Sequence, residues 1–113
     1  MRTLTIGVAD RGTANRRFLS AMAGERQGEF LSFPSLDLLH KVLSPKRVRI
    51  LQDLQRLGPI GLRTLARELV VDAGNLTRDL KQLREFGLVV ETGQGLVVPY
   101  DEIRLEVVIR KVA

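Results

Sequence analysis

Residues 44–86 constrain the fold more than any other part of the chain, because residues that cap or end helices divide them into short helical segments. Ser44 suits an N-cap, whose side-chain oxygen accepts a hydrogen bond from a free backbone N–H group. Pro45 follows at the first helical position, where a missing N–H costs nothing. Gly58-Pro59 ends this helix, because proline cannot continue it. The segment therefore predicts a first helix over residues 45–57.

Two further helices follow. A short one precedes Asp72, and its inner side is formed by Leu62, Leu65, Ala66 and Leu69. Asp72 suits the N-cap of the next helix, where its carboxylate accepts from free N–H groups and complements the helix dipole. Gly87 fits the left-handed position beyond a helix end. On a wheel of about 100° per residue, Leu80 and Leu83 fall within about 40° of Leu76, so these three leucines form the inner face.

The stretch LVVETGQGLVV, residues 88–98, has two apolar runs around a glycine-rich turn and predicts a β-hairpin. Three helices followed by a hairpin is the layout of a winged helix-turn-helix. Ala66 supplies the small residue where two helices cross closely, and Leu76, ten positions later, locks the second helix to the core. Glycine is common in the turn four residues after the small residue, and Val70 stands there instead. This departure leaves the geometry of the turn open.

The flanking segments predict strands by their alternation of apolar and polar residues. Leu4, Ile6 and Val8 indicate a half-buried strand, and Ser35 can cap a short helix. The predicted flanking elements are strands over residues 3–8, 29–33 and 103–109, and helices over residues 13–23 and 35–43.

The expected fold class is α+β: a winged helix-turn-helix of three helices and a hairpin wing, with an added N-terminal strand-helix-strand and a C-terminal strand. We expect residues 1–34 to form an extension for packing or dimerisation. Residues 35–113 are expected to form a DNA-binding domain that includes the last strand. The outer strands could form a small sheet, and its open edge or the helix face of Phe18 and Met22 could serve self-association.

The basic surplus lies in the middle of the chain. The formal net charge is +5, which moderately favours polyanionic partners. Residues 44–86 hold nine Lys/Arg against five Asp/Glu. Aromatic residues are only 4% of the chain, which counts against nucleic-acid recognition by stacking on aromatic side chains. Cysteine is absent, and neither a secretory signal nor an apolar run long enough to span a membrane is visible, so a cytoplasmic location is expected.

A series of motifs runs from Ser44 to Val89: SPKRVRIL, then GP, LAREL, D-x-x-N-[hydrophobic]-x-R-D and LxxxGLV. In this order they resemble the winged helix-turn-helix domain of MarR-like transcriptional regulators of archaea and bacteria. Asp72, Asn75, Leu76, Arg78 and Asp79 match the fourth motif. PYDEI and FPSLDLLHKVL on the flanks are similar too, so the resemblance covers residues 30–113 well and the first 29 residues more loosely. It implies DNA binding and transcriptional regulation, although a fold of this kind hosts many functions.

The outer face of helix 72–86 is expected to enter the major groove of double-stranded DNA, because residues near the start of such a helix approach base edges. Asn75 could pair with adenine, Arg78 with guanine or a phosphate, and Thr77 with a thymine methyl or a phosphate. Lys81 lies further along and is assigned to a phosphate. The alternative is that this polar face is simply solvated.

Further phosphate candidates are Lys46, Arg47, Arg63 and Arg67. The alternative for each is a solvated surface or an ion pair with Asp53, Glu68 or Asp79. The wing tip, TGQG, carries no Lys or Arg, so only Gln94 or the backbone could contact DNA there. The contact between the wing and DNA should therefore be weak, or the hairpin has a purely structural role.

No arrangement for catalysis is visible. The single histidine, His40, lies in an apolar helix, and one histidine without cysteine excludes most zinc patterns. No phosphate-binding glycine loop is present. The sequence therefore predicts a protein that is not an enzyme and has no cofactor or metal.

Two functions remain open. The first is a sequence-specific DNA-binding regulator, a repressor acting as a homodimer. The second is a protein-binding module with the same fold, such as an antitoxin that binds a toxin and represses its own operon, as some proteins resembling this one do. An exposed apolar patch from the first 30 residues would favour the second.

Overall fold

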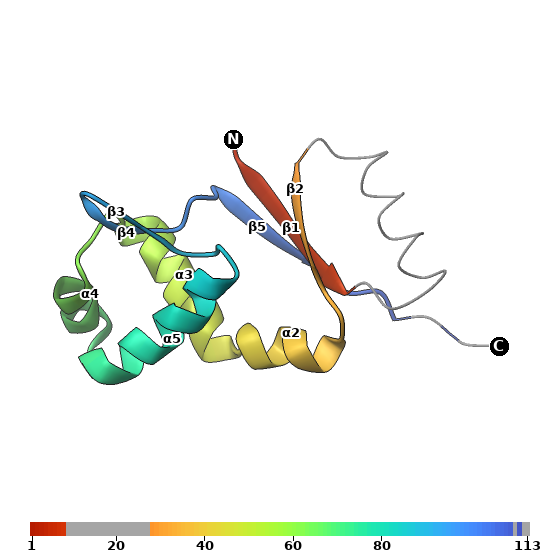
Figure 1. Ribbon diagram of the computed structural model, residues 1–113, viewed down its shortest axis with the longest axis horizontal. Coiled ribbons are helices and arrows are strands. Elements are labelled where there is room, and N and C mark those ends of the chain that lie inside the picture. Colours follow the sequence, from red (N-terminus) through yellow and green to blue (C-terminus); the bar gives the residue numbers. More distant parts are fainter. Residues whose placement is uncertain (9–27, 110, 112–113) are drawn as a thin grey trace. The chain divides into compact units, whose positions relative to one another are not determined.

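The computed structural model describes residues 1–8, 28–109 and 111 of the chain (Figure 1). The fold is mixed α and β. Two compact units divide it: Met1–Lys41 with Glu102–Ala113, and Val42–Asp101. The second unit is thus an insertion between two parts of the first, and each is described by itself below. Among the described residues no helix is both long and apolar enough to cross a bilayer.

The first unit contains a three-stranded parallel sheet in the order β2-β1-β5 (Figure 1). The strands are β1 (Thr3–Val8), β2 (Glu29–Phe33) and β5 (Glu102–Glu106). The central strand pairs with both neighbours, so that Ile6 lies opposite Leu31 on one side and Leu105 on the other. The prediction that the outer strands form one sheet is therefore confirmed.

The central strand is more buried than its alternation predicts. Leu4 and Ile6 are buried as expected, but Thr5 and Gly7 on the opposite face are buried too. A middle strand of a parallel sheet is usually covered on both faces, which explains why a half-buried strand was the wrong expectation. Next to this strand, Arg2 forms an ion pair with Glu29, and the hydrogen bond from Arg2 lowers the pKa of that glutamate.

The last strand is shorter than predicted. It ends at Glu106, whereas the alternation continues to Ile109. The register explains the difference: Glu106 lies opposite Gly7, and β1 ends one residue later at Val8. Val107, Val108 and Ile109 are exposed apolar residues beyond it.

The second unit is built of three helices and a two-stranded hairpin (Figure 1). The helices are α3 (Pro45–Leu57), α4 (Leu62–Leu69) and α5 (Ala73–Glu85), and the strands of the hairpin are β3 (Val90–Thr92) and β4 (Gly95–Val97). The preceding helix α2 (Leu36–Val42) runs up to its start.

The predicted caps are confirmed. The Ser44 hydroxyl accepts a hydrogen bond from the Arg47 N–H at 3.3 Å, with Pro45 in the first turn of α3. The Asp72 carboxylate accepts from the Asn75 N–H at 2.9 Å. Ser35 accepts from the Leu38 N–H in the same way. Because each cap is worth about 1 kcal/mol, these three side chains define where the helices begin.

Leucine side chains form most of the core of the second unit. Its buried apolar residues are Val42, Leu43, Ile50, Leu51, Leu54, Leu65, Ala66, Leu76, Leu80, Leu83, Leu88, Val89 and Leu96. The three leucines predicted for the inner face of α5 are all among them. Full burial of a leucine side chain stabilises the fold by about 1.5–3 kcal/mol, so this face fixes which side of α5 points outward.

The hairpin is held to the segment between α3 and α4 by an isolated bridge between Ile60 and Leu96. The Ile60 N–H donates to the Leu96 carbonyl at 3.2 Å, and the Leu96 N–H donates back at 2.8 Å. Gly95 has φ +132°, and a Cβ atom there would meet the Ile60 backbone at 2.8 Å. Only glycine therefore allows the hairpin to approach this closely.

The observed units differ from the predicted domains. Residues 35–41 and the last strand, which were predicted as part of the helical domain, are grouped with the first sheet in the structure. The reason is a long-range pairing, because β5 pairs with β1 rather than with the hairpin. The predicted helix over residues 13–23, with Phe18 and Met22, lies outside the described residues.

Candidate nucleic-acid interface

Helix α5 has one buried side and one exposed side. Leu76, Leu80 and Leu83 are at most 3% exposed. The opposite side carries the predicted base-reading and phosphate residues Asn75, Thr77, Arg78 and Lys81, and all four are exposed. The arrangement presents amide, hydroxyl and cationic groups along one ridge of a helix that the core holds in place.

The predicted base-reading residues already bond to one another and to the helix. The Arg78 Nη2 donates to the Asn75 Oδ1 at 2.7 Å. The Thr77 hydroxyl donates to the Ala73 carbonyl at 2.8 Å. These local bonds hold the side chains near the start of α5, and each is exposed enough to be exchanged for a bond to another molecule.

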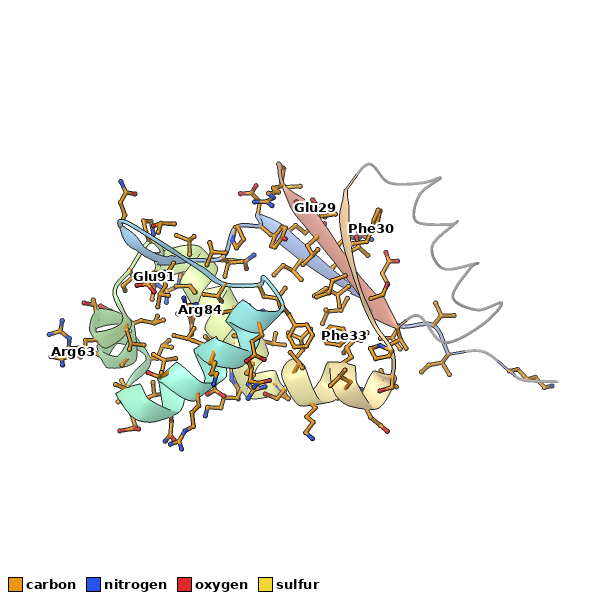
Figure 2. All side chains as sticks on the ribbon, in the orientation of Figure 1. Glu29, Phe30, Phe33, Arg63, Arg84 and Glu91 are labelled. Carbon is orange, nitrogen blue, oxygen red and sulfur yellow. The ribbon has the colours of Figure 1, made fainter. Side chains whose placement is uncertain are left out.

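Two further predicted cations lie on α4. Arg63 and Arg67 are both exposed, and Figure 2 shows the Arg63 side chain extending away from the helix. The Arg67 Nη2 lies 3.4 Å from the Thr64 hydroxyl. Both arginines, with Val70, Val71 and Ala73, also line a shallow hollow at the turn between α4 and α5. The turn therefore combines positive charge with exposed apolar surface.

Val70, where glycine is common, adopts a left-handed conformation with φ 54° and ψ 53°. The Val71 N–H donates to the Ala66 carbonyl at 3.0 Å and closes the end of α4. The turn is thus formed without glycine, although a β-branched residue is strained in this region. Val70 is 88% exposed, so packing of its side chain offsets almost none of the strain energy.

Lys46 and Arg47 lie against Asp79 of α5. The Lys46 Nζ is 2.9 Å from the Asp79 Oδ2, and the Arg47 Nε is 3.0 Å from the Oδ1. Arg47 also donates to the Val42 carbonyl at 3.3 Å, and its side chain is only 18% exposed. The ion-pair alternative therefore describes both residues, although Lys46, at 57% exposure, still reaches solvent.

Asp79 is the buried carboxylate of this cluster, with its side chain 11% exposed. Burial opposes ionisation, but the hydrogen bonds and charges of Lys46 and Arg47 outweigh it, so the pKa of Asp79 is lowered. The carboxylate is therefore ionised at neutral pH and joins the start of α3 to the middle of α5.

Asp79 was predicted only as one of three possible ion-pair partners of the basic residues. Its position carried a signal, because it lies three residues after Leu76 and four before Leu83 and so borders the buried face of α5. A charged residue there needs a partner. The sequence did not show which cations would supply one.

A groove of about 630 Å³ runs between α5, the hairpin and the start of α4. Thr77, Lys81 and Arg84 line it from α5, and Glu91 and Gly95 line it from the hairpin. Figure 2 labels Arg84 and Glu91, whose side chains form an exposed ion pair at 3.5 Å. The groove thus continues the exposed face of α5 toward the hairpin.

The hairpin tip is exposed and uncharged. Gln94 lies in the turn, where its N–H donates to the Thr92 hydroxyl at 3.1 Å. The Thr92 hydroxyl in turn donates to the Gly95 carbonyl. These bonds keep the tip compact and leave the Gln94 side chain exposed at its end.

Comparison with known proteins places the chain in a family. No curated protein matches it. The sequence model of the HVO_A0114 family matches residues 42–105, more than half of the chain. The match takes in all of the second unit and most of β5. The chain therefore belongs to the HVO_A0114 family.

Proposed function

We propose that this protein binds double-stranded DNA in a sequence-specific way and regulates transcription, with α5 as the helix that enters the major groove. The proposal takes α3, α4, α5 and the hairpin as a winged helix-turn-helix of the MarR-like type. The observation that carries it is the exposed ridge of Asn75, Thr77, Arg78 and Lys81 on a helix whose other face is fixed by three buried leucines.

Asn75, Thr77 and Arg78 are the proposed base-reading residues. They lie in the first half of α5, the part of a recognition helix that meets base edges. Asparagine can bond adenine through two groups and arginine can bond guanine in the same way. On binding, Arg78 would exchange its bond to Asn75 for one to a base, which would free the Asn75 amide as well.

Lys81, Arg63 and Arg67 are the proposed phosphate contacts. They are exposed, and such contacts fix the register of a protein on DNA without reading sequence. The groove beside Lys81 offers room for a sugar-phosphate strand between α5 and the hairpin. Lys46 can add a phosphate contact at the start of α3, whereas Arg47 is assigned to positioning α5 through Asp79.

The hairpin has a minor part in this proposal. Its tip offers Gln94 and backbone groups but no cation, so its contact to a minor groove should be weak. Affinity would depend mainly on α5 and α4.

The test has two arms. Duplexes that bind the purified protein are first selected from a random pool, and their affinity is then measured from about 50 to 200 mM salt. The proposal expects an enriched motif, and a log affinity that falls linearly with log salt at about −0.9 per neutralised phosphate. An enriched motif with no salt dependence, or no binding at the lowest salt, would contradict it.

A further inference from the structure

Strand β5 leaves one edge of the described sheet open. It pairs with β1 on one side, and no other strand of the described residues pairs with it on the other. The Glu102 N–H donates to the Arg2 carbonyl, so the backbone groups of Glu102 face β1. Alternate residues direct these groups to opposite sides, so those of Ile103 and Leu105 face the open edge. A row of this kind is a template for a further strand.

The open edge is also apolar at its C-terminal end. Leu105 is 47% exposed, and Val107, Val108 and Ile109 are 42%, 64% and 91% exposed. Val107 continues the alternation, so in an extended chain its backbone groups face the same edge as those of Leu105. The edge is therefore long enough to pair over about five residues.

We propose that this edge binds the same edge of a second copy of the chain, antiparallel, around a two-fold axis at Leu105. A two-fold interface must be complementary to itself. With the axis at this residue, Leu105 meets the partner's Leu105, and Ile103 meets the partner's Val107. Arg104 then lies opposite the partner's Glu106, and this oppositely charged pair occurs twice.

Two alternative registers are less favourable. An axis at Arg104 would place Arg104 opposite the partner's Arg104, and Glu102 opposite the partner's Glu106, and like charges directly opposite repel. An axis at Ile103 would also place Arg104 opposite a glutamate, the partner's Glu102, but it would use Asp101, which lies outside the strand, and would leave Val107 unpaired. In the register at Leu105, the Arg–Glu pairs also fall where hydrogen bonds are absent and side chains approach most closely.

The other edge of the described sheet lacks these features. Strand β2 carries one charged residue, Glu29, so it offers no pair of opposite charges. On β5, Arg104 forms exposed ion pairs at 3.5 and 3.6 Å with Glu102 and Glu106 of its own strand, and these can be exchanged for pairs with the partner's residues. Pro34 follows the strand and cannot donate to a ladder. Only β5 of these two edge strands has a charge pattern that is complementary to itself. The proposed dimer does not depend on the proposed DNA binding.

Cross-linking tests the axis directly. The chain has no cysteine, so Leu105→Cys introduces a single thiol at the two-fold axis. Directly opposite residues in a hydrogen-bonded pair are about 5.5 Å apart at Cα, within the range of a disulfide. Gln94→Cys at the exposed hairpin tip is the control. Mild oxidation at tens of micromolar protein should yield covalent dimer at least tenfold faster for Leu105→Cys. Equal rates, or a monomeric wild-type protein in sedimentation, would overturn the proposal.

Charge reversal tests the register. Arg104→Glu alone places two glutamates opposite each other on both sides of the axis and should raise the dimer Kd by about tenfold. The double variant Arg104→Glu with Glu106→Arg restores both pairs in the opposite sense and should recover wild-type dimerisation. A double variant that dimerises no better than the single one would overturn the register. Circular dichroism shows whether each variant folds.

Discussion

The Nε of Arg47 lies 3.0 Å from the Oδ1 of Asp79, and this bond joins the first turn of α3 to the middle of α5. Both side chains are largely buried, and Lys46 approaches the second carboxylate oxygen. The orientation of α5 therefore rests on a charged cluster as well as on its leucines.

Arg47→Ala should destabilise the protein by about 1.5–3 kcal/mol, because it removes a charge-assisted hydrogen bond from a buried carboxylate. Arg56→Ala is the matched control, since Arg56 forms an exposed pair with Asp53 at 3.6 Å and such pairs contribute at most about 1 kcal/mol. Urea unfolding of both variants measures the difference. Equal losses of unfolding free energy would show that the buried cluster stabilises the protein no more than an exposed ion pair does.

The same cluster predicts a pH dependence of stability. The folded protein lowers the pKa of Asp79 below its usual value near 3.8. The ionised carboxylate therefore stabilises the fold above that value, and the benefit is lost as pH falls through the lower folded pKa. The difference in unfolding free energy between wild type and Asp79→Asn should be constant near neutral pH and shrink below about pH 4. A difference that stays unchanged down to pH 2.5 would contradict this account.

Arg78→Ala should weaken binding to the selected duplex by about 1–3 kcal/mol and relax the preference at one base position.

Lys81→Ala should instead weaken binding to all duplexes alike and reduce the salt slope by about one, because a phosphate contact reads no sequence. Arg56→Ala removes the same charge as Arg78→Ala, but Arg56 lies on α3 and is not among the proposed DNA contacts. Fluorescence anisotropy with matched and mismatched duplexes distinguishes these outcomes. Equal losses from Arg78→Ala and Arg56→Ala would remove Arg78 from the interface.

Val70→Gly should stabilise the protein by up to about 1.5 kcal/mol. Relief of the left-handed strain gains about 1–2 kcal/mol, and the greater freedom of glycine in the unfolded chain offsets about 0.5–1 kcal/mol of it. The exposed valine side chain has little packing to lose. Thermal unfolding provides the measurement. A lower melting temperature for Val70→Gly would show that its side chain has a structural partner.

The local features of the second unit could be predicted from sequence. Ser44 and Asp72 cap the expected helices, and Gly87 has the expected positive φ of 75°. Each of these features is decided by residues that lie within about four positions of one another, where spacing and propensity are informative.

The long-range features could not be predicted in this way. Alternation identified β1 and the last strand, but it did not show that Thr3 pairs with Glu102 in a parallel register. Likewise, the spacing on α5 placed Asp79 beside the buried face without showing that Arg47 would reach it. Both contacts join residues that are far apart in sequence, and no periodic pattern specifies such partners.

Strand β1 lies between a neighbour that follows it closely in the chain and one, β5, at the opposite end. During synthesis Thr3 leaves the ribosome long before its partner Glu102 is made. Residues 42–101, in contrast, form a compact unit that is continuous in sequence. Domains generally fold as units in the order in which they are made. This topology reverses that order for the outer unit. The inserted helices can fold before β5 has been synthesised, whereas β1 cannot pair with β5 until then.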